Sequence, residues 1–180
     1  MTDADRFEAF LREFQDMVFA TAVRLLGQPA EAEDIAQTVF LKAFERFESI
    51  GDSPAAAGWL KTVTTNLCLN HLSRYRARWR FFSEMETGEA HQAPSFEARL
   101  TAPASSDAEA LDEAGEHARL EQALGRLPDH QRVPLVLFHF EEKSYQDIAD
   151  LLGVSLGKVK TDIHRGREAL RAVLAPHYAS

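Results

Sequence analysis

The chain has 180 residues, a mass of 20.2 kDa and a net charge of −8 at neutral pH. This length predicts one or two small domains, and a hydrophobic content of 45% is typical of globular proteins. Its apolar runs are far shorter than the roughly 20 residues of a membrane span, which argues against membrane insertion. Because the N-terminus is acidic rather than basic and then apolar, we expect no signal peptide and a cytoplasmic protein. The lone cysteine, Cys68, excludes an internal disulfide.

The charge is unevenly distributed along the chain. Residues 53–82 carry five basic side chains and no acidic one, whereas residues 83–118 carry nine acids against the single base Arg99. Because salt screens charges beyond about 8–10 Å, a polyanion responds to a local basic patch more than to the net charge. A nucleic-acid partner therefore stays open despite a pI of about 5.4.

Apolar residues at helical spacing predict two helices in the first 50 positions. The first covers 5–26 and stops at the breaker Gly27-Gln28-Pro29. The second covers about 30–48 and is followed by a loop interrupted by Gly and Pro, 49–58. The apolar side of the second helix, which we expect to be buried, consists of Ile35, Val39, Phe40, Phe44 and Phe47.

The opposite side of this second helix carries Asp34, Gln37 and Leu41. Their spacing of three and then four residues places them in one outward stripe, away from the core. An apolar leucine between polar groups on such a stripe indicates a partner surface, and a tolerated surface leucine is the alternative.

A long helix, about 59–80, ends in a segment where arginines alternate with aromatic residues. Guanidinium groups neutralise phosphates and aromatic rings stack on unpaired bases, which points to nucleic acid. Basic side chains at a helix C-terminus also interact favourably with the helix dipole without any ligand, so this structural role remains an alternative. The candidate nucleic-acid residues of this helix are Arg74, Arg76, Arg78 and Arg80.

The composition changes abruptly at Ser83. Residues 83–111 are rich in Ala, Ser, Pro and acids and lack a sustained apolar period, which predicts a flexible acidic linker. The helical pattern resumes near Asp112. We therefore predict an all-α protein in which this linker joins two small helical domains, 1–82 and 112–180.

The second domain contains a helix-turn-helix pattern. Two helices broken at Leu127-Pro128-Asp129 come first. Ser144 is then placed to cap a short helix, and the turn Gly153-Val154-Ser155 leads into a longer helix capped by Ser155. We expect the longer helix to pack through Leu156, Val159, Ile163 and Leu170.

The free face of that longer helix is basic. Lys158, Thr161 and Arg165 follow a three-then-four step, and such groups contact base edges and phosphates when a helix enters the major groove. A helix-turn-helix that serves packing alone is the alternative. The candidate DNA-binding residues here are Ser155, Gly157, Lys158, Lys160, Thr161, His164, Arg165 and Arg167.

The sequence lacks the common catalytic motifs. It has no HExxH pair, no phosphate-binding GxxxxGK[ST] loop and no GxSxG elbow. We therefore expect a protein that is not an enzyme, with no catalytic residues, no metal site and no cofactor.

Three segments together resemble a known family. EAEDIAQTVFLKAFERF (31–47), GWLKTVTTNLCLNHLSRYR (58–76) and the helix-turn-helix segment 127–170 resemble, in order, the motifs of bacterial RNA polymerase sigma factors of the extracytoplasmic-function (ECF) class. The resemblance implies a sigma factor that directs promoter-specific transcription initiation. Three other interpretations remain possible: a free-standing helix-turn-helix DNA-binding regulator, a helical protein-binding adaptor, and a helical enzyme with no recognisable site.

The resemblance also implies partners and residue roles. Core RNA polymerase would be bound at its clamp coiled coil and flap, with the outward stripe on the clamp. Loop 49–58 and the helix from Trp59 would read and open the minus-ten element, with Asn66 and Asn70 facing DNA. The helix after Ser155 would read the minus-thirty-five element, so that both double-stranded and melted promoter DNA are ligands. The resemblance leaves room for an anti-sigma factor as a further partner.

Overall fold

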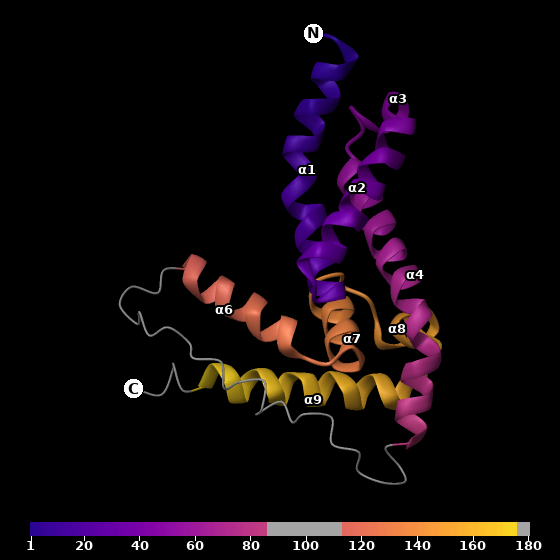
Figure 1. Ribbon diagram of the computed structural model, residues 1–180, viewed down its shortest axis with the longest axis vertical. Helices are drawn as coiled ribbons and strands as arrows, with labels where there is room; N and C mark the ends of the chain where they lie inside the picture. Colours follow the sequence, from indigo (N-terminus) through magenta and orange to yellow (C-terminus); the bar gives the residue numbers. More distant parts are fainter. Residues whose placement is uncertain (86–112, 176–180) are drawn as a thin grey trace. The chain divides into compact units, whose positions relative to one another are not determined.

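The computed structural model describes residues 1–85 and 113–175, with side chains at 1–73 and 115–175. Within these ranges all regular secondary structure is helical, which confirms the all-α prediction (Figure 1). The chain forms two compact units, residues 1–74 and 75–180. From residue 86 onward the predicted linker lies outside the described residues. Among the helices that the structure describes, none is long and apolar enough to cross a membrane.

Helix α1 (Asp3–Leu26) begins and ends at capping groups. The Thr2 hydroxyl accepts a hydrogen bond from the Asp5 amide at 3.2 Å, and the Asp5 carboxylate accepts one from the Thr2 amide at 2.9 Å. Gly27 closes the helix in the left-handed region (φ 73°), and its amide donates to the Val23 carbonyl at 2.7 Å. The predicted stop at Gly27 is confirmed.

The segment predicted as one helix over 30–48 is interrupted. Helix α2 (Pro29–Glu45) ends before Arg46, whose φ of −114° and ψ of 14° are not helical, and a single turn α3 (Phe47–Ile50) follows. The Arg46 carbonyl accepts from both the Ser49 amide and the Ser49 hydroxyl. Serine side chains that bond nearby carbonyls in this way compete with the regular helix pattern.

Helix α4 (Ala56–Met85) begins three residues before and ends five residues after the predicted range of 59–80. It continues to Met85 because neither Gly nor Pro occurs between Gly58 and Gly88. Its first turns pack against α1 and α2, which lie side by side (Figure 1). The core of this first unit consists mainly of Phe10, Val18, Val39, Phe40, Ala43, Ile50, Ala56 and Leu60.

The second unit contains α6 (Glu113–Arg126), α7 (Asp129–His139), α8 (Tyr145–Leu152) and α9 (Leu156–Leu174). These bounds confirm the predicted break at 127–129 and the predicted helix-turn-helix. The fully buried side chains that join the four helices include Leu124, Leu137, Ile148 and Ile163.

A buried arginine and a glycine crossing fix this second unit internally. Arg132, 3% exposed, donates to the Leu127 carbonyl at 2.9 Å and pairs with the Asp129 carboxylate, and so ties the end of α6 to α7. Gly166 lies where α9 crosses α7, since a Cβ atom there would be 3.0 Å from Leu135 Cδ1 and 3.5 Å from the Gln131 carbonyl oxygen. Neither feature was expected from the sequence.

Candidate functional site

The outward stripe on α2 is exposed. Asp34, Gln37 and Leu41 all face solvent, and the Leu41 residue is 67% exposed. Helical spacing aligns the three residues, because steps of three and four keep side chains on one face. The structure therefore brings together the three residues predicted for this stripe.

Phe44 belongs to the same exposed face, and its predicted burial is wrong. The residue is 61% exposed and lies three positions after Leu41, so it extends the outward stripe by one turn. Its ring meets the ring of Phe7 of α1, with centroids 5.0 Å apart and planes at 81°. This T-shaped contact holds the ring in place at the margin of the core while one side stays open to solvent.

The loop that joins α3 and α4 is anchored to α1. Only residues 51–55 of the predicted loop 49–58 lie between helices. Arg6 donates to the Asp52 carboxylate at 2.5 Å, and its guanidinium lies 5.6 Å from the centre of the Phe47 ring. The Ser53 hydroxyl accepts from the Ala55 amide at 3.2 Å, which shapes the approach to α4.

The predicted DNA-facing residues of α4 lie on its exposed side. Asn66 and Asn70 are exposed, whereas Thr65 and Cys68 are buried. Asn66 and Asn70 are four residues apart and so occupy one row along the helix. Arg74, Arg76, Arg78 and Arg80 are helical in backbone, but their side chains lie outside the described residues.

The helix-turn-helix has the cap geometry that the sequence predicts. The Ser144 hydroxyl accepts from the Asp147 amide at 3.1 Å, and the Ser155 hydroxyl accepts from the Lys158 amide at 3.2 Å. Between the two helices Gly153 adopts φ 66°, a left-handed conformation that an L side chain would strain. The first turn of α9 is thereby fixed relative to α8.

The exposed face of α9, called here the reading face, consists of Lys160, Thr161, His164 and Arg165. Gly157, also exposed, has nothing within 4 Å of a Cβ position, so a partner can approach the backbone closely there. Leu156 was expected to pack but is 38% exposed, because it is the first residue of the helix and lies before the turn that meets the core.

Two other predicted DNA-binding residues of α9 are engaged within the protein. The Lys158 ammonium donates to the buried Asp162 carboxylate at 2.8 Å. The Arg167 Nε–H donates to His139 Nε2 at 3.0 Å, and its guanidinium lies 5.4 Å from the centre of the Phe138 ring. Burial, together with the charge of Arg167, lowers the pKa of His139 below its usual 6.5.

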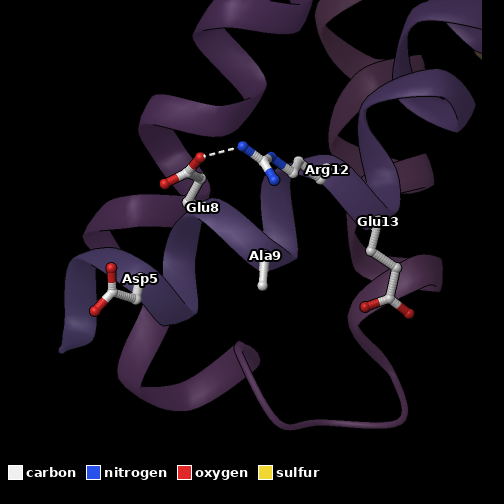
Figure 2. Close-up of a pocket in the computed structure, with 5 residues that line it drawn as sticks. All are labelled: Asp5, Glu8, Ala9, Arg12 and Glu13. Atoms are coloured by element: carbon white, nitrogen blue, oxygen red, sulfur yellow. Dashed lines mark hydrogen bonds and ion pairs between the residues drawn. The ribbon is translucent and has the colours of Figure 1, made fainter. Parts of the chain in front are cut away.

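A shallow depression on α1 is lined by exposed residues of that one helix. Figure 2 shows the Arg12 guanidinium turned toward Glu8, with which it pairs at 2.6 Å. Ligand pockets bring polar groups together from several elements, and this depression does not. Within the described part of the chain no group of three or more His, Cys, Asp or Glu side chains could hold a metal ion. The depression is lined by Asp5, Glu8, Ala9, Arg12 and Glu13.

Two family models match this chain. The model for sigma-70 region 2 matches residues 10–79, and the model for sigma-70 region 4 matches residues 117–170. The first range covers α2 and most of α1 and α4, and the second covers most of α6, all of α7 and α8, and α9 through Leu170. Both candidate surfaces, the outward stripe and the reading face, lie inside the matched ranges.

Individual relatives match over nearly the whole chain. The ECF RNA polymerase sigma factor SigW of Bacillus subtilis is 30% identical over 96% of this chain and 90% of its own length. The ECF sigma factor SigE of Mycolicibacterium smegmatis is 34% identical over 95% of this chain and 62% of its own length. A solved structure of the sigma factor RpoE with the anti-sigma factor NepR from Bartonella quintana is 24% identical, covers 94% of this chain and 96% of that chain, and has a TM-score of 0.49.

Proposed function

This chain belongs to the ECF class of RNA polymerase sigma factors and directs promoter-specific transcription initiation, and from that premise we propose which of its surfaces bind polymerase and which bind DNA. The first unit binds core polymerase through the outward stripe, and α4 binds the minus-ten element. The second unit binds the minus-thirty-five element through α9. The chain acts by binding, in the cytoplasm, and the core enzyme supplies the catalysis.

The main support for DNA binding by α9 is the composition of its reading face. It presents Lys160 and Arg165 together with Thr161 and His164 on the second helix of a helix-turn-helix, the helix that such domains insert in the major groove. Arg165 is suited to guanine, because its guanidinium can donate to two acceptors at once. Lys160 lies at the edge of the face, where contact with phosphate is expected.

The exposed row on α4 supports a second DNA contact. Asn66 and Asn70 can donate to and accept from base edges, and Arg74 and Arg78 continue the same four-residue step. Along this row the amide side chains could contact the bases of a DNA strand, and the arginines after them could contact its phosphates. The anchored loop 51–55 lies at the start of the same helix, so it is placed to take part.

The outward stripe supports the contact with polymerase. It combines a carboxylate, an amide and two large apolar side chains, once Phe44 is added to Asp34, Gln37 and Leu41. Exposed apolar groups with a polar rim are typical of protein interfaces. Asp34 and Gln37 would fix orientation while Leu41 and Phe44 are removed from water.

The test is transcription with purified components. Core polymerase is mixed with this chain and with genomic fragments, and the start sites of the transcripts are mapped. We expect start sites that core polymerase alone does not use. A folded chain that binds DNA tightly but neither binds core polymerase nor changes its start sites would contradict the proposal and favour a free-standing regulator.

Two substitutions separate base reading from phosphate binding on α9. Arg165→Ala should weaken binding by about 1–3 kcal/mol and relax preference at one base pair. Lys160→Ala should weaken binding to all sequences alike and lower the salt dependence by about one unit of slope. Holoenzyme binding to a set of minus-thirty-five variants at several salt concentrations measures both, and the reverse pattern would overturn the assignment of faces.

A further inference from the structure

A buried carboxylate lies directly beside the reading face of α9. The side chain of Asp162 is 7% exposed, and its Oδ2 accepts a hydrogen bond from Lys158 Nζ at 2.8 Å. The Lys158 side chain is 27% exposed, so the pair is shielded from water on the carboxylate side and open on the lysine side. Lys160, four positions before His164 on the reading face, is exposed and forms no ion pair within the described residues.

The pair restricts what Lys158 can do on DNA. Its ammonium would have to leave Asp162 to reach a phosphate, and a buried carboxylate that loses its partner is left uncompensated. An ion pair between Lys158 and a solvent-exposed phosphate would recover little of the free energy lost at Asp162, because exposed ion pairs are weak. The backbone of Lys158 is also held, since its amide donates to the Ser155 cap.

We propose that Asp162 is a positioning residue for promoter selectivity: it keeps Lys158 within the protein and so limits sequence-independent attraction of α9 to DNA. The inference rests on the proposed role of α9 in DNA binding. Contacts to phosphate add affinity for every sequence alike, whereas base contacts distinguish sequences. With Lys158 withheld, a larger share of the binding free energy of α9 comes from Thr161 and Arg165.

The test compares lysine and carboxylate variants in holoenzyme. Lys158→Gln, Asp162→Asn, the double variant and Lys160→Gln are assembled with core polymerase. Transcript mapping identifies a promoter, and a fluorescent duplex of that promoter is prepared. Binding is measured to this duplex and to the same duplex with the minus-thirty-five element scrambled. The readout is the slope of log Kobs against log salt between about 50 and 200 mM, because each phosphate contact adds about 0.9 to that slope.

We expect Lys160→Gln to lower the slope by about one unit, equal to a three- to fourfold change in affinity across this salt range. Lys158→Gln should lower it by less than half as much. Asp162→Asn should raise the slope by about one unit and tighten binding to the scrambled duplex, with a gain over wild type about three- to fourfold larger at 50 mM than at 200 mM salt. Adding Lys158→Gln to Asp162→Asn should remove that gain, which shows that the gain comes from the released lysine and not from lost repulsion.

Several results would overturn the inference. If Lys158→Gln lowers the slope as much as Lys160→Gln, Lys158 already contacts DNA; this comparison decides even if Asp162→Asn fails to fold. If folded Asp162→Asn gains nothing, or if the double variant keeps the gain, the carboxylate does not withhold the lysine. If no variant, Lys160→Gln included, changes the slope, α9 is not the DNA surface and the proposed function of α9 fails with the inference.

Discussion

Replacing Leu41 by Ala separates binding from folding on α2. Full burial of a leucine side chain is worth about 1.5–3 kcal/mol, and because Leu41 is 67% exposed in the free chain, about two-thirds of that, roughly 1–2 kcal/mol, remains to be gained on binding. Leu41→Ala should therefore raise the Kd for core polymerase about 5- to 30-fold. The free energy of unfolding should change by no more than about 0.5 kcal/mol, since little of the side chain is packed.

Two controls define the assay. Val39→Ala, in the buried face of the same helix, should reduce the free energy of unfolding by about 1–3 kcal/mol. Lys42→Ala changes an exposed residue beside Leu41 but off the outward stripe, and it should leave both quantities unchanged. Affinity is measured by competition with labelled wild-type chain for core polymerase, and stability by urea unfolding. Wild-type affinity for Leu41→Ala, or a loss that appears only with a loss of stability, would refute the assignment.

Three further predictions concern the second unit. Arg132→Met leaves the buried Leu127 carbonyl without this donor and should lower the free energy of unfolding by about 2–4 kcal/mol. Asp129→Asn should cost less, because the Asn oxygen can still accept from Arg132; urea unfolding measures both, and equal costs would contradict the role given to Arg132. Gly153→Ala should lower the free energy of unfolding by about 1–2 kcal/mol, because the residue at this position has φ 66°. Gly58→Ala, in open space on α4, should not destabilise the protein, and thermal unfolding compares the two variants. The lowered pKa of His139 means that the folded chain binds fewer protons, so stability is full above the unfolded pKa of about 6.5 and falls as pH drops through the folded pKa. His139→Gln should flatten that part of the stability profile, and an unchanged profile would contradict it.

The helix ends of the second unit could be predicted because local residues determine them. Ser144 and Ser155 each accept from an amide three residues later, and Gly153 supplies the positive φ between them. These interactions involve neighbours in sequence, so their spacing alone identifies them. The break at Arg46 is also local, but serine at that distance is compatible with a continuous helix, and the sequence therefore predicted one helix where there are two.

Burial at helix margins could not be predicted in the same way. Phe44 lies four positions after the buried Phe40 and three after the exposed Leu41, so its spacing fits either face, and it is 61% exposed. Asp162 has the opposite outcome, a charged residue that is buried beside an exposed face. Both depend on how closely a neighbouring helix approaches, which is a tertiary property that periodicity does not contain.

The crossing at Gly166 limits how this protein can be re-engineered. Grafting the α9 segment of a relative onto this scaffold, as a test of the proposed role of α9, would also import whatever residue the relative has at position 166. A Cβ atom there would be 3.0 Å from Leu135 Cδ1, the end of a flexible side chain, so Leu135 would have to give by a few tenths of an ångström. A chimera should therefore exchange Leu135 and Gly166 together, so that the side chain on α7 fits the residue that comes with the new helix.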